Sequence, residues 1–459
     1  GEIIVNSGAN LDLRGGNADT LGTTNAGTII NGSGIVRLRD LGPITVSEPV
    51  TINGVNNRGS LKSYASTDLT FNGPVTLNTN GVLAVESWAN PNTSSEPGSK
   101  KVWFLNSAIS DDGNGRGVHF LTDVSQSSGT GSLSRTSEIV LGGIGTYGGY
   151  THITANRAPD DVSPFTGTVH MTNGNDRLPT TSTLFLGGLM NGIGHAEGNG
   201  RLFLNGNSQE LAGLVMLGSG VSNYVAGGSP TLSTLTLNVG AGTNNAFGGV
   251  IGGSGANANN LALVSKGPGI LDLSGANTYT GATSVTNGTL LVNGTHFGGG
   301  AYAIQTGGTL GGPGLIDAVV QALAGSIVAP GNSIGTLTTS NSFDLDGILQ
   351  IELANGAGPG LGLSDLLDVN GFFDITNGTI QFVYAETLTN SAYVFAEHNS
   401  LSGHPFLNVL NLPDSYAIDY DYLGGNQIAL VIPEPSALAL LGLGLTLLAR
   451  FVTRRTRDS

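Results

Sequence analysis

Residues 267–294 have the sequence GPGILDLSGANTYTGATSVTNGTLLVNG, and this stretch decides the fold. Its first apolar run, residues 270–273, has the composition of a short strand. Residues 284–286 place one valine between two polar residues, as on a half-buried strand, whereas residues 290–292 are continuously apolar, as on a strand buried on both faces. An Asn-Gly pair at 287–288 separates the two runs, where the backbone must turn. The stretch therefore predicts short strands joined by tight turns.

The same pattern recurs upstream. Residues 141–155 align without gaps to residues 273–287, and residues 165–174 align to residues 279–288. The alignments place an aromatic residue and a glycine at matching positions: Tyr147 and Gly149, Phe165 and Gly167, and Tyr279 and Gly281. Chance similarity between Gly- and Thr-rich segments is the alternative, and the shared register argues against it. A repeated supersecondary unit predicts a solenoid, in which each coil buries its apolar face against its neighbours.

Residues 271–294 resemble the autotransporter-associated β-strand repeat of bacterial surface proteins. The flanking segments FGGVIGG, LVSKGPG, APGNSIGTL and LQIEL resemble the lead-in and the follow-on of that repeat: residues 247–253, 263–269, 329–337 and 349–353. The resemblance covers about residues 138–370. It implies a parallel β-helix displayed outside the cell, and it implies no catalytic activity.

Composition agrees with many short strands and tight turns. Glycine contributes 74 of the 459 residues, about twice its usual share, and charged residues make up only 11%. Amphipathic helices need a charged face, so they are disfavoured. A mean hydropathy of +0.11 argues against wholesale disorder. The absence of cysteine excludes disulfides, thiolate metal sites and cysteine nucleophiles.

The charge is strongly negative and unevenly placed. Residues 1–432 carry 13 of the 17 cations and 30 of the 32 acids, which gives a net charge of −17. A surface this acidic repels nucleic acid and anionic polymers, so no nucleic-acid partner is expected. The chain begins with Gly1 and predicts a strand at once, at residues 3–5, so we expect a truncated or processed N-terminus.

We therefore predict an all-β protein, a right-handed parallel β-helix followed by one C-terminal hydrophobic (transmembrane) helix. An N-terminal solenoid region is expected at residues 1–137 and the repeats at 138–294. Further coils and a cap are expected at 295–432, and a separate C-terminal segment at 433–459. Residues 317–323 are predicted as strand because they are short and flanked by Gly-rich turns. The polar tracts at residues 89–100, 123–136 and 157–164 are predicted as loops. Residues 1–135 show strand patterns without a clean repeat, and residues 372–384 and 427–432 are the last clear strands, the latter as a cap.

The C-terminal segment changes character at Pro433. Residues 436–449 contain no charge, and extension to residue 453 gives 18 residues that include Arg450. This approaches the roughly 20 residues that span a bilayer, with the cations on the cytoplasmic side. The cations that would stop the segment are Arg450, Arg454, Arg455 and Arg457.

This tail resembles the PEP-CTERM sorting signal, with its motif at Pro433, Glu434 and Pro435, an apolar helix, and an Arg-rich end. The resemblance implies recognition by a membrane-embedded exosortase, insertion of residues 436–453 in the inner membrane, and processing near the motif. A plain single-pass anchor that is never cleaved fits the same residues, and so does a buried soluble helix.

Several catalytic motifs are rejected. Residues 331–335 fit G-x-S-x-G, but strand patterns flank them on both sides, whereas the nucleophile elbow requires a following helix. Residues 143–148 fit G-x-G-x-x-G without a following helix. No catalytic, cofactor or metal residues are therefore predicted.

Acids and histidines give no clear site. Asp344 with Asp346 and Asp365 with Asp368 are the nearest paired carboxylates, and solvated turn acids are expected. None of the seven histidines has a spacing typical of a zinc site. His398 and His404 come closest, and solvated loop histidines are expected at these two positions. The seven histidines are His119, His152, His170, His195, His296, His398 and His404.

The favoured function is an exported, non-enzymatic surface or extracellular-matrix protein, whose long polar faces contact glycans or neighbouring cells. The PEP-CTERM resemblance ties such proteins to exopolysaccharide and biofilm formation. The alternative is a polysaccharide lyase or a glycosidase built on a β-helix. The fold alone does not exclude either enzyme. A lyase needs cations to neutralise a uronate, and residues 1–432 have few.

Overall fold

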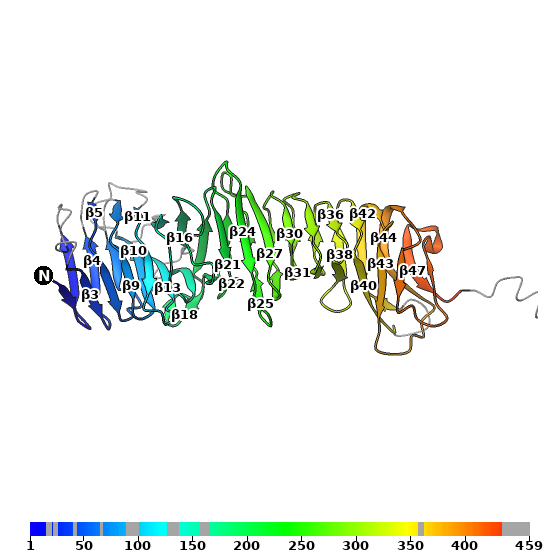
Figure 1. Ribbon diagram of the computed structural model, residues 1–459, viewed down its shortest axis with the longest axis horizontal. Helices are drawn as coiled ribbons and strands as arrows, with labels where there is room; N and C mark the ends of the chain where they lie inside the picture. The colour runs from blue at the N-terminus through cyan, green and yellow to red at the C-terminus, as the bar shows by residue number, and fades with distance from the viewer. Residues whose placement is uncertain are drawn as a thin grey trace, which may run out of the picture.

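The computed structural model describes residues 1–14, 21, 26–39, 44–64, 68–88, 101–125, 137–156, 166–356 and 362–433. These residues form a long rod of short strands (Figure 1). The chain winds along the rod, and strands of successive coils pair in parallel along three faces. The described part of the chain is thus all-β with the architecture of a parallel β-helix, as predicted.

The first face runs along most of the rod. Between β12 and β21 it continues through Gly145, which bridges Ile109 and donates its N–H to the Arg177 carbonyl at 2.8 Å. Its strands are β1 (Ile3–Val5), β3 (Thr28–Asn31), β6 (Val50–Asn53), β9 (Val75–Leu77), β12 (Ile109–Asp111), β21 (Ser208–Leu211), β24 (Ser233–Asn238), β27 (Leu261–Lys266), β30 (Thr283–Val285), β33 (Tyr302–Ile304), β36 (Val320–Ala322) and β39 (Phe343–Leu345).

The second face follows the first along the coil. From β22 to β25 it continues through the Asn245 side chain, which accepts the Leu214 N–H at 3.1 Å. Its strands are β2 (Asn10–Arg14), β4 (Ile35–Arg39), β7 (Leu61–Tyr64), β10 (Gly81–Trp88), β13 (Val118–Ser125), β15 (Thr151–Asn156), β17 (Thr183–Leu186), β22 (Gly213–Met216), β25 (Asn244–Phe247), β28 (Ile270–Leu273), β31 (Gly288–Val292), β34 (Gly308–Gly312), β37 (Ile327–Pro330), β40 (Ile348–Ala354), β43 (Thr379–Val383) and β45 (Asn408–Leu410).

The third face closes each coil. From β26 to β29 the Asn277 side chain accepts the Ile251 N–H at 2.9 Å. Its strands are β5 (Ile44–Val46), β8 (Leu69–Phe71), β11 (Lys101–Leu105), β14 (Ser137–Leu141), β16 (Thr166–Met171), β20 (Asn199–Phe203), β23 (Tyr224–Ala226), β26 (Val250–Ile251), β29 (Ala276–Asn277), β32 (Thr295–His296), β35 (Leu315–Ile316) and β38 (Thr336–Thr339).

The C-terminal end departs from this regular winding. β42 (Leu366–Asp374) pairs with β38 through residues 366–369 and with β39 through residues 373–374, so one strand serves two faces. β44 (Ala392–Ser402) pairs in parallel with β42. β47 (Gln427–Val431) then pairs antiparallel with both β44 and β46. The remaining elements are β18 (Leu189–Met190), β19 (Ile193–Gly194), β41 (Leu363–Ser364), β46 (Ala417–Asp419) and the short 3-10 helix η1 (Tyr422–Gly424).

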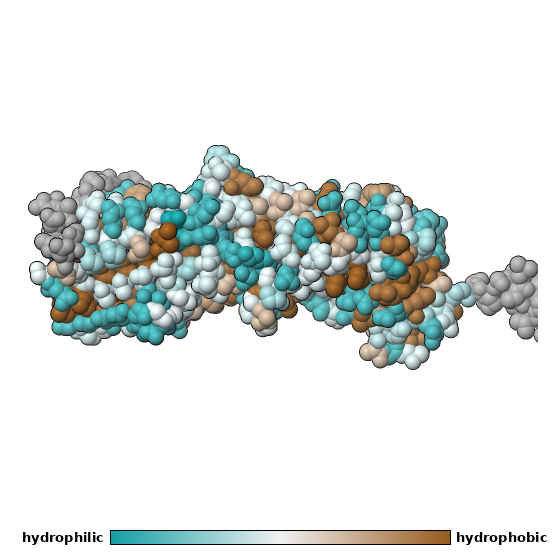
Figure 2. Space-filling model, viewed as in Figure 1, coloured by the Kyte–Doolittle hydropathy of each residue, from teal (hydrophilic) through white to brown (hydrophobic). Residues whose placement is uncertain are grey.

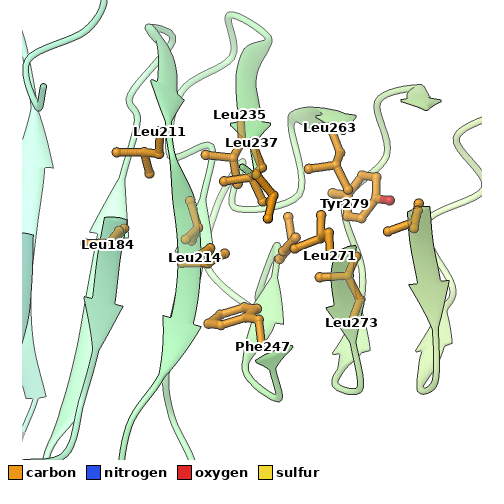
Figure 3. Close-up of a cluster of buried hydrophobic side chains, with 14 of the residues drawn as sticks. Leu184, Leu211, Leu214, Leu235, Leu237, Phe247, Leu263, Leu271, Leu273 and Tyr279 are labelled. Atoms are coloured by element: carbon orange, nitrogen blue, oxygen red, sulfur yellow. The ribbon is translucent and has the colours of Figure 1, made fainter. Parts of the chain in front are cut away.

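The core lies inside the coils because side chains alternate along each strand. In β24, Leu235 and Leu237 are buried, whereas Thr234 and Thr236, which alternate with them along the strand, are partly exposed. Leu235 pairs in register with Leu263 of β27, so the apolar positions of successive coils stack (Figure 3). One continuous cluster of buried residues extends in this way from Val5 to Leu430.

A repeat is also present in residues 1–135, where the sequence pattern predicted none. Asn6, Asn31, Asn53 and Asn78 each end a first-face strand or follow it directly, and their side-chain amides form a ladder with N···O distances of 3.1, 3.0 and 2.7 Å. The two inner amides, Asn31 and Asn53, each donate to the preceding asparagine and accept from the following one, whereas Asn6 only accepts and Asn78 only donates within the ladder. The ladder fixes the register of the first coils at one corner.

The predicted transmembrane segment, residues 436–453, lies outside the described residues, as do Glu434, Pro435 and the four stop cations. Pro433 is described, and it is exposed. In the part of the chain that the structure describes, no helix has the length and apolar character needed to cross a membrane. Two other predictions concern described segments. β36 shows that residues 317–323 contain a strand, and Asp123–Ser125, predicted as loop, belong to β13.

Candidate functional site

The repeat aromatics lie in the core. Tyr147 and Tyr279 are both fully buried, and each hydroxyl lies 2.6 Å from the Oγ1 of the threonine four residues later, Thr151 or Thr283. Burial raises the pKa of Tyr279 to about 12 and shifts the pKa of Tyr147 in the same direction. The hydroxyls therefore stay protonated and serve as buried hydrogen-bonding groups at the corners of the coil.

The aligned copies occupy different corners of the coil. Tyr147 lies between the first and second faces, just before β15, whereas Tyr279 lies between the third and first faces, just before β30. Gly149 and Gly281 each precede the strand, in close contact with the backbone of the preceding coil. The repeated unit is therefore one turn and one strand, which the fold uses at more than one corner.

The third copy is less regular. Gly167 lies inside β16, which begins at Thr166, whereas Gly281 lies before β30 begins at Thr283. Val169 occupies the position of Thr283, so the copy has no threonine partner for an aromatic hydroxyl. Phe165 lies outside the described residues.

The paired acids do not form a catalytic pair. Asp365 is buried, which corrects the expectation of a solvated turn acid, and its carboxylate accepts the N–H groups of Gly335 and Glu352 at 3.0 and 2.8 Å. Burial raises the pKa of the Asp365 carboxyl to about 7, against the lowering effect of those N–H groups. Asp365 thus fixes the turn at residues 331–335, which links β37 to β38 without a helix.

Asp344 and Asp346 lie apart from Asp365. Asp346 accepts the Asn377 side-chain amide at 2.8 Å, and Asp344 pairs in register with Asp374 of the next coil. Burial, followed by repulsion from Asp346 and Asp374, raises the pKa of Asp344. Among the described residues, no group of three or more histidine and acidic side chains is arranged to hold a metal ion.

Of the two histidines predicted as solvated loop residues, His404 is exposed and follows β44, whereas His398 differs. His398 is buried in β44, which corrects the expectation of a solvated loop residue, and burial lowers its pKa. His296 is buried as well, and its ring stacks on Tyr279 with centroids 4.1 Å apart. His404 follows β44, and the centre of its ring lies 5.6 Å from the centre of the Tyr420 ring.

His119 and His152 form a buried pair that the sequence analysis missed. Their Nδ1 atoms lie 2.9 Å apart, so one nitrogen donates to the other. His119 Nε2 lies 2.7 Å from the Tyr150 hydroxyl, which accepts the Asn191 amide at 3.0 Å, and His152 Nε2 lies 2.8 Å from the Gly187 carbonyl. Burial lowers the pKa of both imidazoles, and repulsion from His152 lowers the pKa of His119 further. Both rings are therefore neutral at pH 7.

A hairpin covers this pair on the outer side of the second face. β18 and β19 pair antiparallel, and Ile193 packs on Val82, Ala84 and Leu121, which point outward from β10 and β13. This second small core is separate from the interior of the coils. The histidine network and the apolar contacts together hold the hairpin on the sheet.

The outer side of the third face carries a row of aromatic and charged side chains, which we call the outer stripe: Glu138, His170, Arg201, Phe203 and Tyr224. His170 Nε2 lies 3.0 Å from Glu138 Oε2, and the His170 ring stacks on Phe203 at 4.5 Å. Phe203 meets Tyr224 edge-on at 5.4 Å, and the Arg201 guanidinium lies 4.7 Å from the centre of the Tyr224 ring. The stripe therefore crosses four neighbouring strands, β14, β16, β20 and β23.

The chemistry of the outer stripe is that of a hydrogen-bonding surface. Arg201 Nη2 donates to the Ser222 hydroxyl at 2.5 Å, which leaves other guanidinium N–H groups for a ligand. Glu138 and the Tyr224 hydroxyl add an acceptor and a donor beside partly exposed rings. Glycosidases use two carboxyl groups about 5–10 Å apart, and Glu138 is the single carboxylate among the five residues of the stripe.

Comparison with known proteins agrees with the repeat resemblance. Residues 263–292 match the family model of the passenger-associated transport repeat. The matched residues run from β27 through β31 and include Tyr279 and Gly281. The match indicates a passenger-type, extracellular β-helical protein, as expected from the sequence. A search of curated proteins gave no match.

Proposed function

We propose that this chain is an exported, non-enzymatic β-helix of the cell surface or extracellular matrix, sorted through its C-terminal segment. The passenger-type repeat at residues 263–292 supports export. We expect the coils of the β-helix to be right-handed, because crossover connections between parallel strands almost always are. The Pro-Glu-Pro motif, the apolar run at residues 436–449 and the terminal arginines support recognition by an exosortase in the inner membrane.

The outer stripe is the proposed contact with exopolysaccharide. Strands of successive coils lie about 4.8 Å apart, so the stripe offers regularly spaced groups along the rod, as an extended polymer requires. Arg201 and Glu138 provide polar groups for sugar hydroxyls, and Phe203 and Tyr224 provide apolar area. Because the chain is strongly acidic, the expected ligand is a neutral glycan rather than an anionic one.

Replacing Arg201 by glutamine is expected to weaken binding of the neutral fraction of the producing cells' exopolysaccharide about tenfold. The reason is the loss of the charged donors that lie over Tyr224. Binding is measured by titration calorimetry on the full chain. The matched control is Lys266→Gln, which removes an outward cation of the first face that pairs with Glu210 at 2.8 Å.

The control variant is expected to bind like the unchanged chain. The outer stripe would be rejected as the contact surface if the Arg201→Gln chain bound as tightly as the unchanged chain. It would also be rejected if the Lys266→Gln chain lost as much affinity as the Arg201→Gln chain. Cleavage of the polysaccharide during the titration would instead favour the lyase or glycosidase alternative.

A further inference from the structure

The C-terminal half of the rod is acidic without any compensating cation. Residues 267–433 contain 13 acids and no lysine or arginine, whereas residues 1–266 contain 17 acids and 13 cations. The net charge is therefore −13 in the second segment and −4 in the first. A surface with one sign of charge attracts partners of the opposite sign and raises their rate of association.

The second face ends at this end of the rod in a strand with one free edge. β45 pairs with β43, and no other described strand pairs with it. All three of its residues are exposed, and Val409 and Leu410 keep 38% and 41% of their accessible surface. In contrast, β44 is covered by β47 and β46. An exposed apolar edge strand offers unpaired N–H and C=O groups to a further strand.

Apolar residues gather around this edge. Leu407 and Leu412, on either side of β45, keep 63% and 43% of their accessible surface, and Val383 and Tyr384 at the end of β43 keep 39% and 38%. Figure 2 shows hydrophobic residues gathered over this end of the rod. Contiguous exposed apolar residues on a soluble surface mark interaction sites.

A cavity of about 370 Å³ opens beside the edge. It lies where β43 and β45 end, because residues 384–388 follow β43 directly and residues 413–416 come shortly after β45. Glu386 and Asp414 line it, together with the rings of Tyr384 and Tyr416. The Tyr416 hydroxyl donates to the Asn390 carbonyl at 2.6 Å, which fixes that ring in the wall.

The two carboxylates have unused capacity for a cationic ligand. Glu386 Oε1 accepts the Asn355 N–H at 3.0 Å, which leaves its second oxygen available. No lysine or arginine occurs between residues 267 and 449, so no nearby side chain in this stretch neutralises Glu386 or Asp414. Aromatic rings and carboxylates together suit an ammonium or guanidinium group, through cation–π attraction and charge-assisted hydrogen bonds.

We propose that the C-terminal end of the rod binds an extended basic peptide of a partner protein. The peptide backbone pairs with the free edge of β45, its apolar side chains cover Val409 and Leu410, and a lysine or arginine enters the cavity between Glu386 and Asp414. Main-chain pairing supplies affinity in this mode of recognition, and the pocket supplies specificity. A second copy of this chain is disfavoured because it would bring the same acidic surface into contact.

The test uses the full chain and a fluorescent peptide of about ten alternating threonine and valine residues that ends in two arginines. The same peptide ending in two glutamates is the charge control, and a version N-methylated on every residue, which has no backbone N–H group to donate along either edge, is the backbone control. Binding is followed by fluorescence anisotropy. The arginine peptide is expected to bind at least about tenfold more tightly than either control peptide, and less tightly at high salt.

Two double variants locate the site. Glu386→Gln with Asp414→Asn is expected to weaken binding of the arginine peptide about tenfold. Asp317→Asn with Asp368→Asn removes two carboxylates elsewhere in the acidic half and is expected to change binding less than about twofold. The unfolding midpoints of both variants show whether the rod remains folded.

Three results would overturn the proposal: equal binding of the arginine and glutamate peptides, unchanged binding after N-methylation, or equal losses in the two double variants. A chain in which Arg454, Arg455 and Arg457 are replaced by glutamine gives a further check. If this replacement increases peptide binding about tenfold, the occupant is the chain's own C-terminal segment and not a partner.

Discussion

Replacing Gly275 by alanine is expected to destabilise the β-helix by about 3 kcal/mol or more. Gly275 lies at the corner between β28 and β29, and a Cβ at this position would lie 1.8 Å from the Gly249 carbonyl oxygen of the preceding coil. Relief of this overlap requires separation of two backbones that are held together on one side by the β25–β28 pair and on the other by the hydrogen bond from Ile251 to Asn277.

The same corner repeats along the rod, which makes the effect cooperative. A Cβ at Gly294 would lie 2.2 Å from the Gly275 oxygen, and one at Gly314 would lie 2.3 Å from the Gly294 oxygen. Successive coils therefore stack through glycine at this corner, and displacement of one coil strains the next. Solenoid stability is largely a sum of such nearest-neighbour terms.

Urea unfolding followed by circular dichroism measures this change. The control is Gly255→Ala, where the new Cβ would be 3.8 Å from the Ala258 Cβ, an ordinary contact, so the expected change is within about 0.5 kcal/mol. If both variants unfold at the same urea concentration, the coils do not stack as closely as described.

Acidification from pH 7 to pH 5 is expected to destabilise the β18–β19 hairpin by up to about 4 kcal/mol. The fold lowers the pKa of His119 and of His152, mainly because both rings are buried, so the folded state takes up protons less readily than the unfolded one. The contribution of the pair is complete above about pH 6.5, the unfolded pKa, and is lost as the pH falls toward the folded values. Each histidine contributes about 1.4 kcal/mol per pH unit in that range.

Hydrogen exchange at residues 189–194 measures this effect locally, at pH 7 and pH 5. Local measurement matters because Asp365, whose pKa is raised to about 7, has the opposite dependence: its contribution is complete at low pH and is lost as the pH rises. The variant His119→Gln with His152→Gln keeps hydrogen-bonding groups without titration and is expected to flatten the dependence. Equal protection of the unchanged chain at both pH values would contradict the buried neutral pair.

The sequence predicted the fold wherever inside and outside positions alternate. Residues 270–273 and 284–286 gave clear strand patterns, and the structure has β28 and β30 there. β44 was missed because consecutive residues such as Ala392 and Tyr393 are both buried, which removes the alternation on which the prediction depends. The asparagine ladder had a usable signal, since apolar-x-apolar-Asn recurs at residues 3–6, 50–53 and 75–78, and residues 28–31 differ from it only by a threonine at the first position.

The surface features could not be predicted in the same way. His119 and His152 are 33 residues apart, and their burial depends on a hairpin that folds back from later in the chain. The outer stripe combines residues from four coils, each of which is an ordinary outward position in its own strand. Asp365 is buried by the turn before β38, which no local pattern around Asp365 indicates.

The most direct test of the proposed export and sorting is the C-terminal mass of the protein recovered from the native cells and their medium, with and without the exosortase. The account predicts that wild-type cells release a chain shortened near Pro433, Glu434 and Pro435, and that cells without the exosortase retain the intact segment through Arg457. An intact C-terminus in the inner membrane under both conditions would contradict sorting and surface release, and would leave a plain membrane anchor.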